Sequence, residues 1–123
     1  MLITRLFQLI SERKFTEAER VLERVKSKME RNGQKDFNQG YLTALNGIIL
    51  TNKSGNEASY EFFANINLND VNALKKHYKD FLEKSESRFL ADYDRGYFSA
   101  LCDYMRVALR TAQRNAPNKD VQS

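Results

Sequence analysis

The residue types best suited to catalysis or metal binding are sparse in this 123-residue sequence. It contains one histidine, His77, and one cysteine, Cys102, which rules out the usual zinc ligand sets. His77 lies among lysines on a predicted helix, as is typical of a surface or boundary residue. Cys102 lies on a mainly apolar helix without an adjacent histidine, which predicts a buried and inert thiol.

The acidic residues of the second half do not match a known metal-binding pattern. Asp92, Asp94 and Asp103 lack the glycine and the terminal glutamate that complete a calcium-binding loop. Asp92 is more simply an N-terminal residue of a helix, and Asp36 matches it in the first half. The sequence therefore predicts no catalytic, cofactor-binding or metal-ligating residues, no cofactor and no enzymatic activity.

Length and composition indicate one globular domain. With 41% apolar and 29% charged residues, the chain can bury a core without metal or disulfide staples. Cys102 has no internal disulfide partner, which favours a reducing, cytoplasmic setting. Arg5 interrupts the apolar N-terminus and no cleavage site follows, so this segment predicts a helix and not a signal peptide. No apolar run approaches the roughly 20 residues that span a bilayer, so the protein is expected to be soluble or at most peripheral, with no membrane as a partner.

The sequence resembles itself at an offset of 56 residues. Residues 36–45 align with residues 92–101 with five identities in ten positions, and the apolar register upstream also matches without a gap. We interpret this as an internal duplication of a three-helix unit. The predicted domain covers 1–114, with copy one at 1–55 and copy two at 56–114, and residues 115–123 form a disordered tail.

Each copy is predicted to contain three helices, which gives an all-α bundle of about six helices with a pseudo-two-fold relationship. Thr16 and Glu19 form a capping-box pattern at the start of the second helix. Asn32-Gly33 predicts the end of that helix, and Asn69-Asp70 the start of its counterpart. The predicted helices are 2–12, 17–32 and 37–51 in copy one, and 57–66, a helix that follows Asp70, and 91–114 in copy two.

A shared Gly-Tyr-x-x-Ala-Leu motif marks the third helix of each copy. Glycine inside a helix costs about 1 kcal/mol relative to alanine, so its presence in both copies requires a reason. Gly40 and Ala44 lie one turn apart on one helical face, as do Gly96 and Ala100, and such faces allow close helix packing. We expect the two helices to be central and to cross each other. A phosphate cradle is disfavoured because each glycine is solitary and helical.

The last predicted helix, 91–114, has an apolar arc that leaves only a narrow polar strip. A helix of this kind is either enclosed by its own domain or covered by a partner.

Five cations are spaced so that they share about one quadrant of the predicted second helix. The whole positive excess of +4 belongs to residues 1–55, and copy two lacks an equivalent set. The set is either a solvated helix face or a docking surface for nucleic-acid phosphates or an acidic protein. We call it the basic ridge, and its members are Arg20, Arg24, Lys28, Arg31 and Lys35.

The stretch from Ile10 to Lys26 resembles the second half of a tetratricopeptide-type helical hairpin through Phe15, Ala18, Leu22 and Val25. A 56-residue, three-helix period departs from that family's two-helix repeat of about 34 residues. The resemblance implies only a helical interaction scaffold.

These observations together favour a small, non-enzymatic helical interaction or adaptor module. It is expected to bind a protein partner or to self-associate through helical faces. The alternative is an accessory factor that binds the phosphate backbone of nucleic acid or a ribonucleoprotein through the basic ridge.

Overall fold

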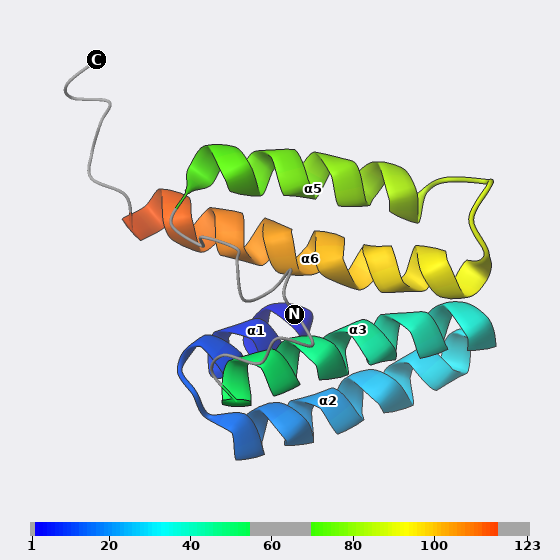
Figure 1. The fold of residues 1–123 in the computed structure, drawn as a ribbon. Coiled ribbons are helices and arrows are strands. Elements are labelled where there is room, and N and C mark those ends of the chain that lie inside the picture. Colours follow the sequence, from blue (N-terminus) through cyan, green and yellow to red (C-terminus); the bar gives the residue numbers. More distant parts are fainter. Residues whose placement is uncertain (1, 55–69, 116–123) are drawn as a thin grey trace.

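The structure of the chain is a computed structural model, and it describes residues 2–54 and 70–115 (Figure 1). Every regular element in these two ranges is a helix, so the predicted all-α class is confirmed. Within the same ranges, no helix is long and apolar enough to cross a membrane. The elements are α1 (Leu2–Ser11), α2 (Phe15–Met29), the short 3-10 helix η1 (Glu30–Asn32), α3 (Lys35–Ser54), α5 (Val71–Ser85) and α6 (Asp92–Asn115). The predicted helix 57–66, and the predicted tail from residue 116 onward, lie outside the described residues.

Helix α6 lies between α5 and α3, and α2 lies on the other side of α3 (Figure 1). Helix α1 packs on α2 and also contacts α3 and α6. Figure 1 also shows that α3 and α6 run in the same direction, with their N-termini at one end of the molecule. Helix α2 runs antiparallel to α3, and α5 runs antiparallel to α6. The two helices that carry the Gly-Tyr-x-x-Ala-Leu motif are therefore adjacent and parallel.

The buried residues form one continuous core. The three other α-helices, α1, α2 and α5, each contribute an apolar stripe with helical spacing to the core around α3 and α6. The largest fully enclosed side chains come from α1, α3, α5 and α6, and they are Leu6, Leu45, Ile48, Leu74 and Met105.

The apolar arc of α6 is used inside the domain. Leu101 and Met105 are buried against the rest of the core, and the Tyr104 ring packs on Phe7 with ring centres 5.1 Å apart. Phe98 stacks on Phe81 of α5 at 6.0 Å. Of the two alternatives for this helix, enclosure by its own domain is the one that the described residues support.

Local interactions explain where several helices begin and end. Asp70 caps α5 by accepting a hydrogen bond from the Ala73 N–H at 3.1 Å, as predicted. Gly33 has φ of +74°, the left-handed conformation that closes η1, so the predicted stop is also confirmed. The same connection between α2 and α3 is also held by Asn38, whose side chain is buried. Its Nδ2 donates to the Met29 carbonyl at 2.8 Å and to Asn32 Oδ1 at 3.0 Å.

The predicted capping box at Thr16 and Glu19 is wrong. Helix α2 begins at Phe15, and its N-cap residue is Lys14, whose side chain makes no capping hydrogen bond. The tight turn after α1 sets this start, because the Lys14 N–H donates to the Leu9 carbonyl at 2.9 Å. Thr16 is thereby placed inside the first turn of the helix, where its hydroxyl cannot act as a cap.

Candidate functional site

Helices α3 and α6 are in backbone contact at their glycines. A Cβ atom on Gly40 would lie 1.9 Å from the Tyr93 carbonyl oxygen, and one on Gly96 would lie 2.0 Å from the Phe37 carbonyl oxygen. The two contacts are reciprocal, because each glycine faces the residue three positions before the other glycine. Ala44 and Ala100, one turn further along, are fully buried. All four motif residues therefore lie in the packed interior, where none is accessible to a ligand.

A polar network lies on the same pair of helices. The Tyr41 hydroxyl donates to Asp103 Oδ2 at 2.6 Å, and Arg106 Nη2 donates to Asp103 Oδ1 at 3.0 Å. Tyr41 is buried, whereas the side chains of Asp103 and Arg106 retain about a quarter of their exposure. The arrangement satisfies a buried hydroxyl and pairs the carboxylate, so its role is to join α3 to α6.

Three weak acids of the core are held in their neutral forms. Burial, followed by the Asp103 charge, raises the pKa of Tyr41 well above its ordinary value of 10.0. Burial raises the pKa of the Cys102 thiol to about 11, and the nearby Asp103 adds to the effect. Burial likewise raises the pKa of Tyr104. Because only the thiolate is a good nucleophile, this rise in pKa lowers the reactivity of the Cys102 thiol at neutral pH.

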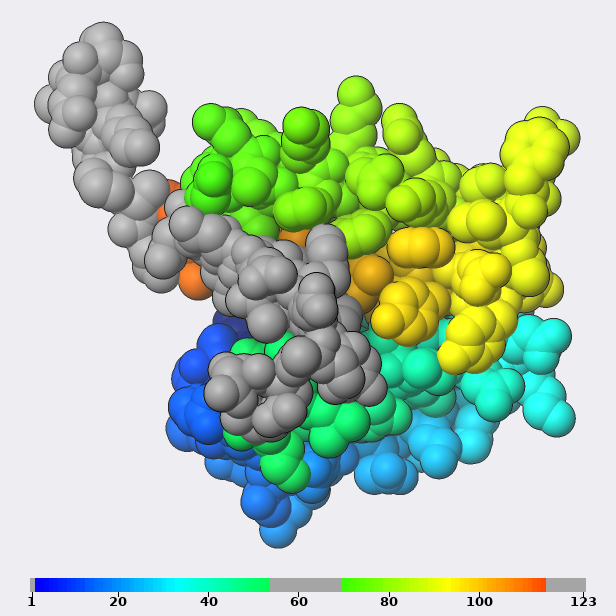
Figure 2. Space-filling view, viewed as in Figure 1, coloured from blue at the N-terminus to red at the C-terminus, as the bar shows by residue number. Residues whose placement is uncertain are grey.

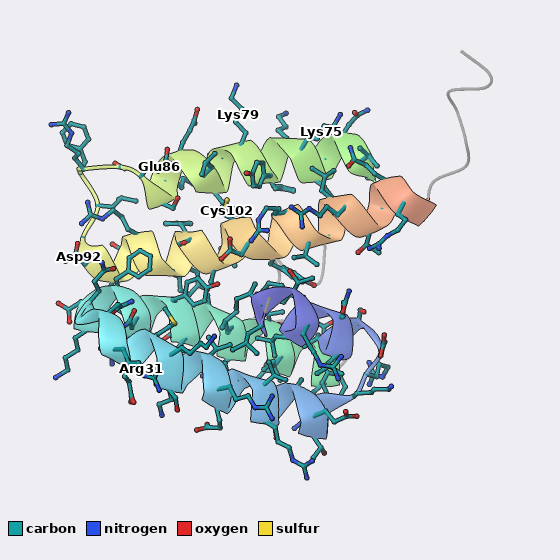
Figure 3. All side chains as sticks on the ribbon, turned by 180° about the vertical axis from the view of Figure 1, so that it is seen from behind. Arg31, Lys75, Lys79, Glu86, Asp92 and Cys102 are labelled. Carbon is teal, nitrogen blue, oxygen red and sulfur yellow. The ribbon has the colours of Figure 1, made fainter. Side chains whose placement is uncertain are left out.

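The surroundings of Cys102 and His77 agree with structural roles. Figure 3 shows Cys102 between α5 and α6, and its Sγ lies 3.9 Å from the Tyr78 carbonyl oxygen. His77 is half-buried and its ring stacks on Phe81 at 6.1 Å. Among the residues that the structure describes, no three His, Cys, Asp or Glu side chains are grouped so that they could hold a metal ion.

The basic ridge differs from its predicted geometry. Only Arg20, Arg24 and Lys28 lie on α2, which ends at Met29. Arg31 belongs to η1, and Lys35 is the first residue of α3. The left-handed turn at Gly33 reverses the chain between them, so the five cations do not share one continuous helix.

All five ridge side chains are nevertheless exposed (Arg31 is labelled in Figure 3). None of them forms an ion pair with a carboxylate in residues 2–54 or 70–115. Glu23 and Glu30 lie close by and line the same shallow hollows as Arg24 and Lys35. The ridge is therefore a surface of exposed cations with interspersed acidic residues.

The turn between α5 and α6 presents a feature that the sequence does not predict. Phe89 is 98% exposed, the highest value among the large apolar side chains described. The turn is ordered by Ser87, whose Oγ accepts from the Phe89 N–H at 3.2 Å and whose carbonyl accepts from Arg95 Nη1 at 3.3 Å. Arg95 is itself paired with Asp92.

A hollow of about 620 Å³ opens at the same end of the molecule, where the N-termini of α3 and α6 meet. Figure 2 shows the yellow α5–α6 turn projecting at this end, above the cyan turn between α2 and α3. Figure 3 shows Asp92, one of the residues that line the hollow, next to the start of α3. We call this face, with the Phe89 turn and the hollow, the tip. The hollow is lined by Gly33, Gln34, Lys35, Asp36, Phe37, Asp92 and Arg95.

Comparisons with known proteins returned no match: no protein-family model, no curated protein and no solved structure resembles this chain significantly. The resemblance of Ile10–Lys26 to a tetratricopeptide hairpin thus has no counterpart in them.

Proposed function

We propose that this chain is a non-enzymatic helical interaction module that binds a protein partner or a second copy of itself. The observation that carries the proposal is Phe89, an exposed aromatic side chain on a turn fixed by hydrogen bonds. Aromatic anchors that enter a partner's pocket supply most of the binding energy of many interfaces. A fixed turn favours this use, because little conformational entropy is lost on binding.

Other parts of the described molecule are weaker candidates for a functional surface. The other candidate reactive groups serve the interior: Cys102 is buried, and Asp103 is occupied by Tyr41 and Arg106. The apolar arc of α6, a second candidate surface, packs against neighbouring helices. The tip therefore has the strongest features of a partner surface on the described part of the molecule.

The proposal predicts that capture of partners depends on Phe89. Immobilised full-length chain should retain specific proteins, its own copies included, from an extract of its native cell. Phe89→Ala should abolish that retention, because truncation removes the anchor and leaves the fold intact. Leu50→Ala is the matched control, since Leu50 is a large apolar residue that is 51% exposed on α3, away from the turn that carries Phe89. Equal retention by the parent and Phe89→Ala, measured by quantitative mass spectrometry, would contradict the proposal.

A second function is supported by the five exposed and unpaired cations of the basic ridge. Such a surface suits the phosphate backbone of nucleic acid, and its binding would depend strongly on salt. Three to five phosphate contacts would give a slope of about −3 to −4.5 in log K against log salt.

The test of this alternative is a triple charge reversal, Arg20→Glu, Arg24→Glu and Arg31→Glu. It should lower affinity for mixed RNA and DNA at least about ten-fold and flatten the salt slope. The control reverses Lys75, Lys76 and Lys79 on α5, which changes the net charge equally at a distant face (Figure 3). Fluorescence anisotropy at several salt concentrations measures both. Equal loss in both variants would indicate attraction by net charge alone, and no binding by the parent would exclude this function.

We also propose that the two halves are duplicated units and that the complete domain has six helices. The reciprocal Gly40 and Gly96 contacts support this, because they join positions related by the same 56-residue offset that relates the two motifs. The parallel course of α3 and α6 is also what a pseudo-two-fold axis between them would produce.

A further inference from the structure

The tip of the molecule has a protruding side chain, Phe89, and a hollow at the same end, and Arg95 links them because it lines the hollow and hydrogen-bonds to Ser87 of the turn. We propose that two copies of this chain associate through this face about a two-fold axis, with Arg88 and Phe89 of each copy seated in the hollow of the other. This inference rests on the proposed function and names its partner as a second copy. A two-fold contact requires both complementary parts on the same surface, since each copy offers the same patch. The tip meets that requirement.

Fixed geometry makes Phe89 suitable as the protruding part. The Ser87 hydrogen bonds to the Phe89 N–H and to Arg95 hold the turn in place, and the Arg95–Asp92 pair ties it to the start of α6. Arg95 and Asp92 also line the hollow, so one pair of residues positions both parts. The half-buried Phe37 ring, stacked on Tyr41 at 6.4 Å, supplies an apolar surface for an aromatic side chain to contact.

Charge on the two parts is complementary. Arg88 is exposed beside Phe89, and Asp36 is exposed in the hollow, and neither has an ion-pair partner within residues 2–54 and 70–115. A two-fold contact would bring Arg88 of one copy to Asp36 of the other, twice. The charged residues lining the hollow comprise two cations and two carboxylates, so the faces do not repel each other through net charge.

Charge also disfavours the other candidate face for self-association. The basic ridge would place like charges opposite one another across a two-fold axis, which costs free energy. A different protein that presents an Arg-Phe pair would also fit the hollow, but it would leave the chain's own Phe89 exposed. A second copy fills the hollow and buries Phe89 at the same time.

Sedimentation velocity of the full chain over a range of concentrations tests the inference. We expect a reversible dimer whose dissociation constant rises about 30-fold or more in Phe89→Ala and is unchanged in Leu50→Ala. Arg88→Glu and Asp36→Arg should each weaken the dimer. The double variant should restore it, because both pairs then reform with reversed polarity. This recovery distinguishes a direct contact from a change in fold, which circular dichroism checks in every variant.

Two results would overturn the inference. One is a parent chain that stays monomeric at several hundred micromolar, and the other is a dimer that neither Phe89→Ala nor the charge reversals weaken. If the chain is monomeric and still captures other proteins in a Phe89-dependent way, the self-association fails while the proposed function survives. If both are lost together, the tip is not an interaction surface.

Discussion

Alanine at Gly40 or at Gly96 is expected to destabilise the protein by about 3 kcal/mol, although alanine is the better helix former. The added methyl group would meet backbone carbonyl oxygen at 1.9 or 2.0 Å, well inside van der Waals contact. Backbone atoms cannot rotate away as a side chain can, so α3 and α6 must separate along their shared face. Overpacking typically costs 1 to 3 kcal/mol and occasionally more, and a clash with backbone atoms belongs above that range, at about 4 kcal/mol. The propensity gain of about 1 kcal/mol then leaves a net loss of about 3 kcal/mol.

Urea unfolding followed by circular dichroism measures this effect. The two glycine variants should be destabilised by similar amounts because their contacts are reciprocal. The double variant should cost less than the sum, since one separation of the helices relieves both clashes. Asn46→Ala, at an exposed position of α3, should change stability by no more than about 0.5 kcal/mol. A loss below about 1 kcal/mol in either glycine variant would show that the helices are not in backbone contact.

Alkaline conditions should destabilise the protein through its buried weak acids. The pKa of Tyr41 is raised above 10.0 and that of Cys102 to about 11, so the folded state retains protons that the unfolded chain releases. Stability from these groups is therefore complete below about pH 9. It is lost from about pH 9 upward for Cys102 and from about pH 10 upward for Tyr41. Tyr41 alone should cost about 1.4 kcal/mol by pH 11.

The Tyr41→Phe variant separates the contribution of Tyr41 to the loss of stability at high pH from the contributions of the other weak acids. At pH 7 the variant should lose about 1 to 2 kcal/mol, because Asp103 loses one charge-assisted hydrogen bond but keeps Arg106. Between pH 9.5 and 11 its stability should fall less steeply than that of the parent. The remaining slope belongs to Cys102 and Tyr104, and Cys102→Ala should reduce it further. Parallel curves for the parent and Tyr41→Phe in this range would refute the assignment to Tyr41.

Features that depend on local chemistry were predictable from the sequence. Apolar periodicity indicated the helices, Asp70 the start of α5, and Gly33 the turn between α2 and α3. The Thr16 cap failed because the turn after α1 hydrogen-bonds Lys14 to Leu9 and starts the helix earlier. The predicted geometry of the basic ridge was wrong for a related reason. It assumed that one helix continues past Gly33, whereas the helix has already ended there.

Features that depend on distant residues were not predictable. The bond between Tyr41 and Asp103 joins residues 62 positions apart, and no spacing rule selects that pair. In the sequence, Asn38 looks like an ordinary polar helix residue, and only the fold shows that it is buried and bonded to Met29 and Asn32. The exposure of Phe89 is likewise a property of the turn geometry, because most phenylalanines in such a sequence lie in the core.

The parallel course of α3 and α6 has a consequence for the order in which the chain folds. Each of these helices can pair early with its antiparallel neighbour, because only a short turn closes those hairpins. Parallel partners cannot be joined so briefly, and the contacts between them carry a larger loop-closure entropy. Assembly is thus expected to end with the two preformed hairpins docking at the glycines, and substitutions at that seam should accelerate unfolding more than they slow the first steps of folding.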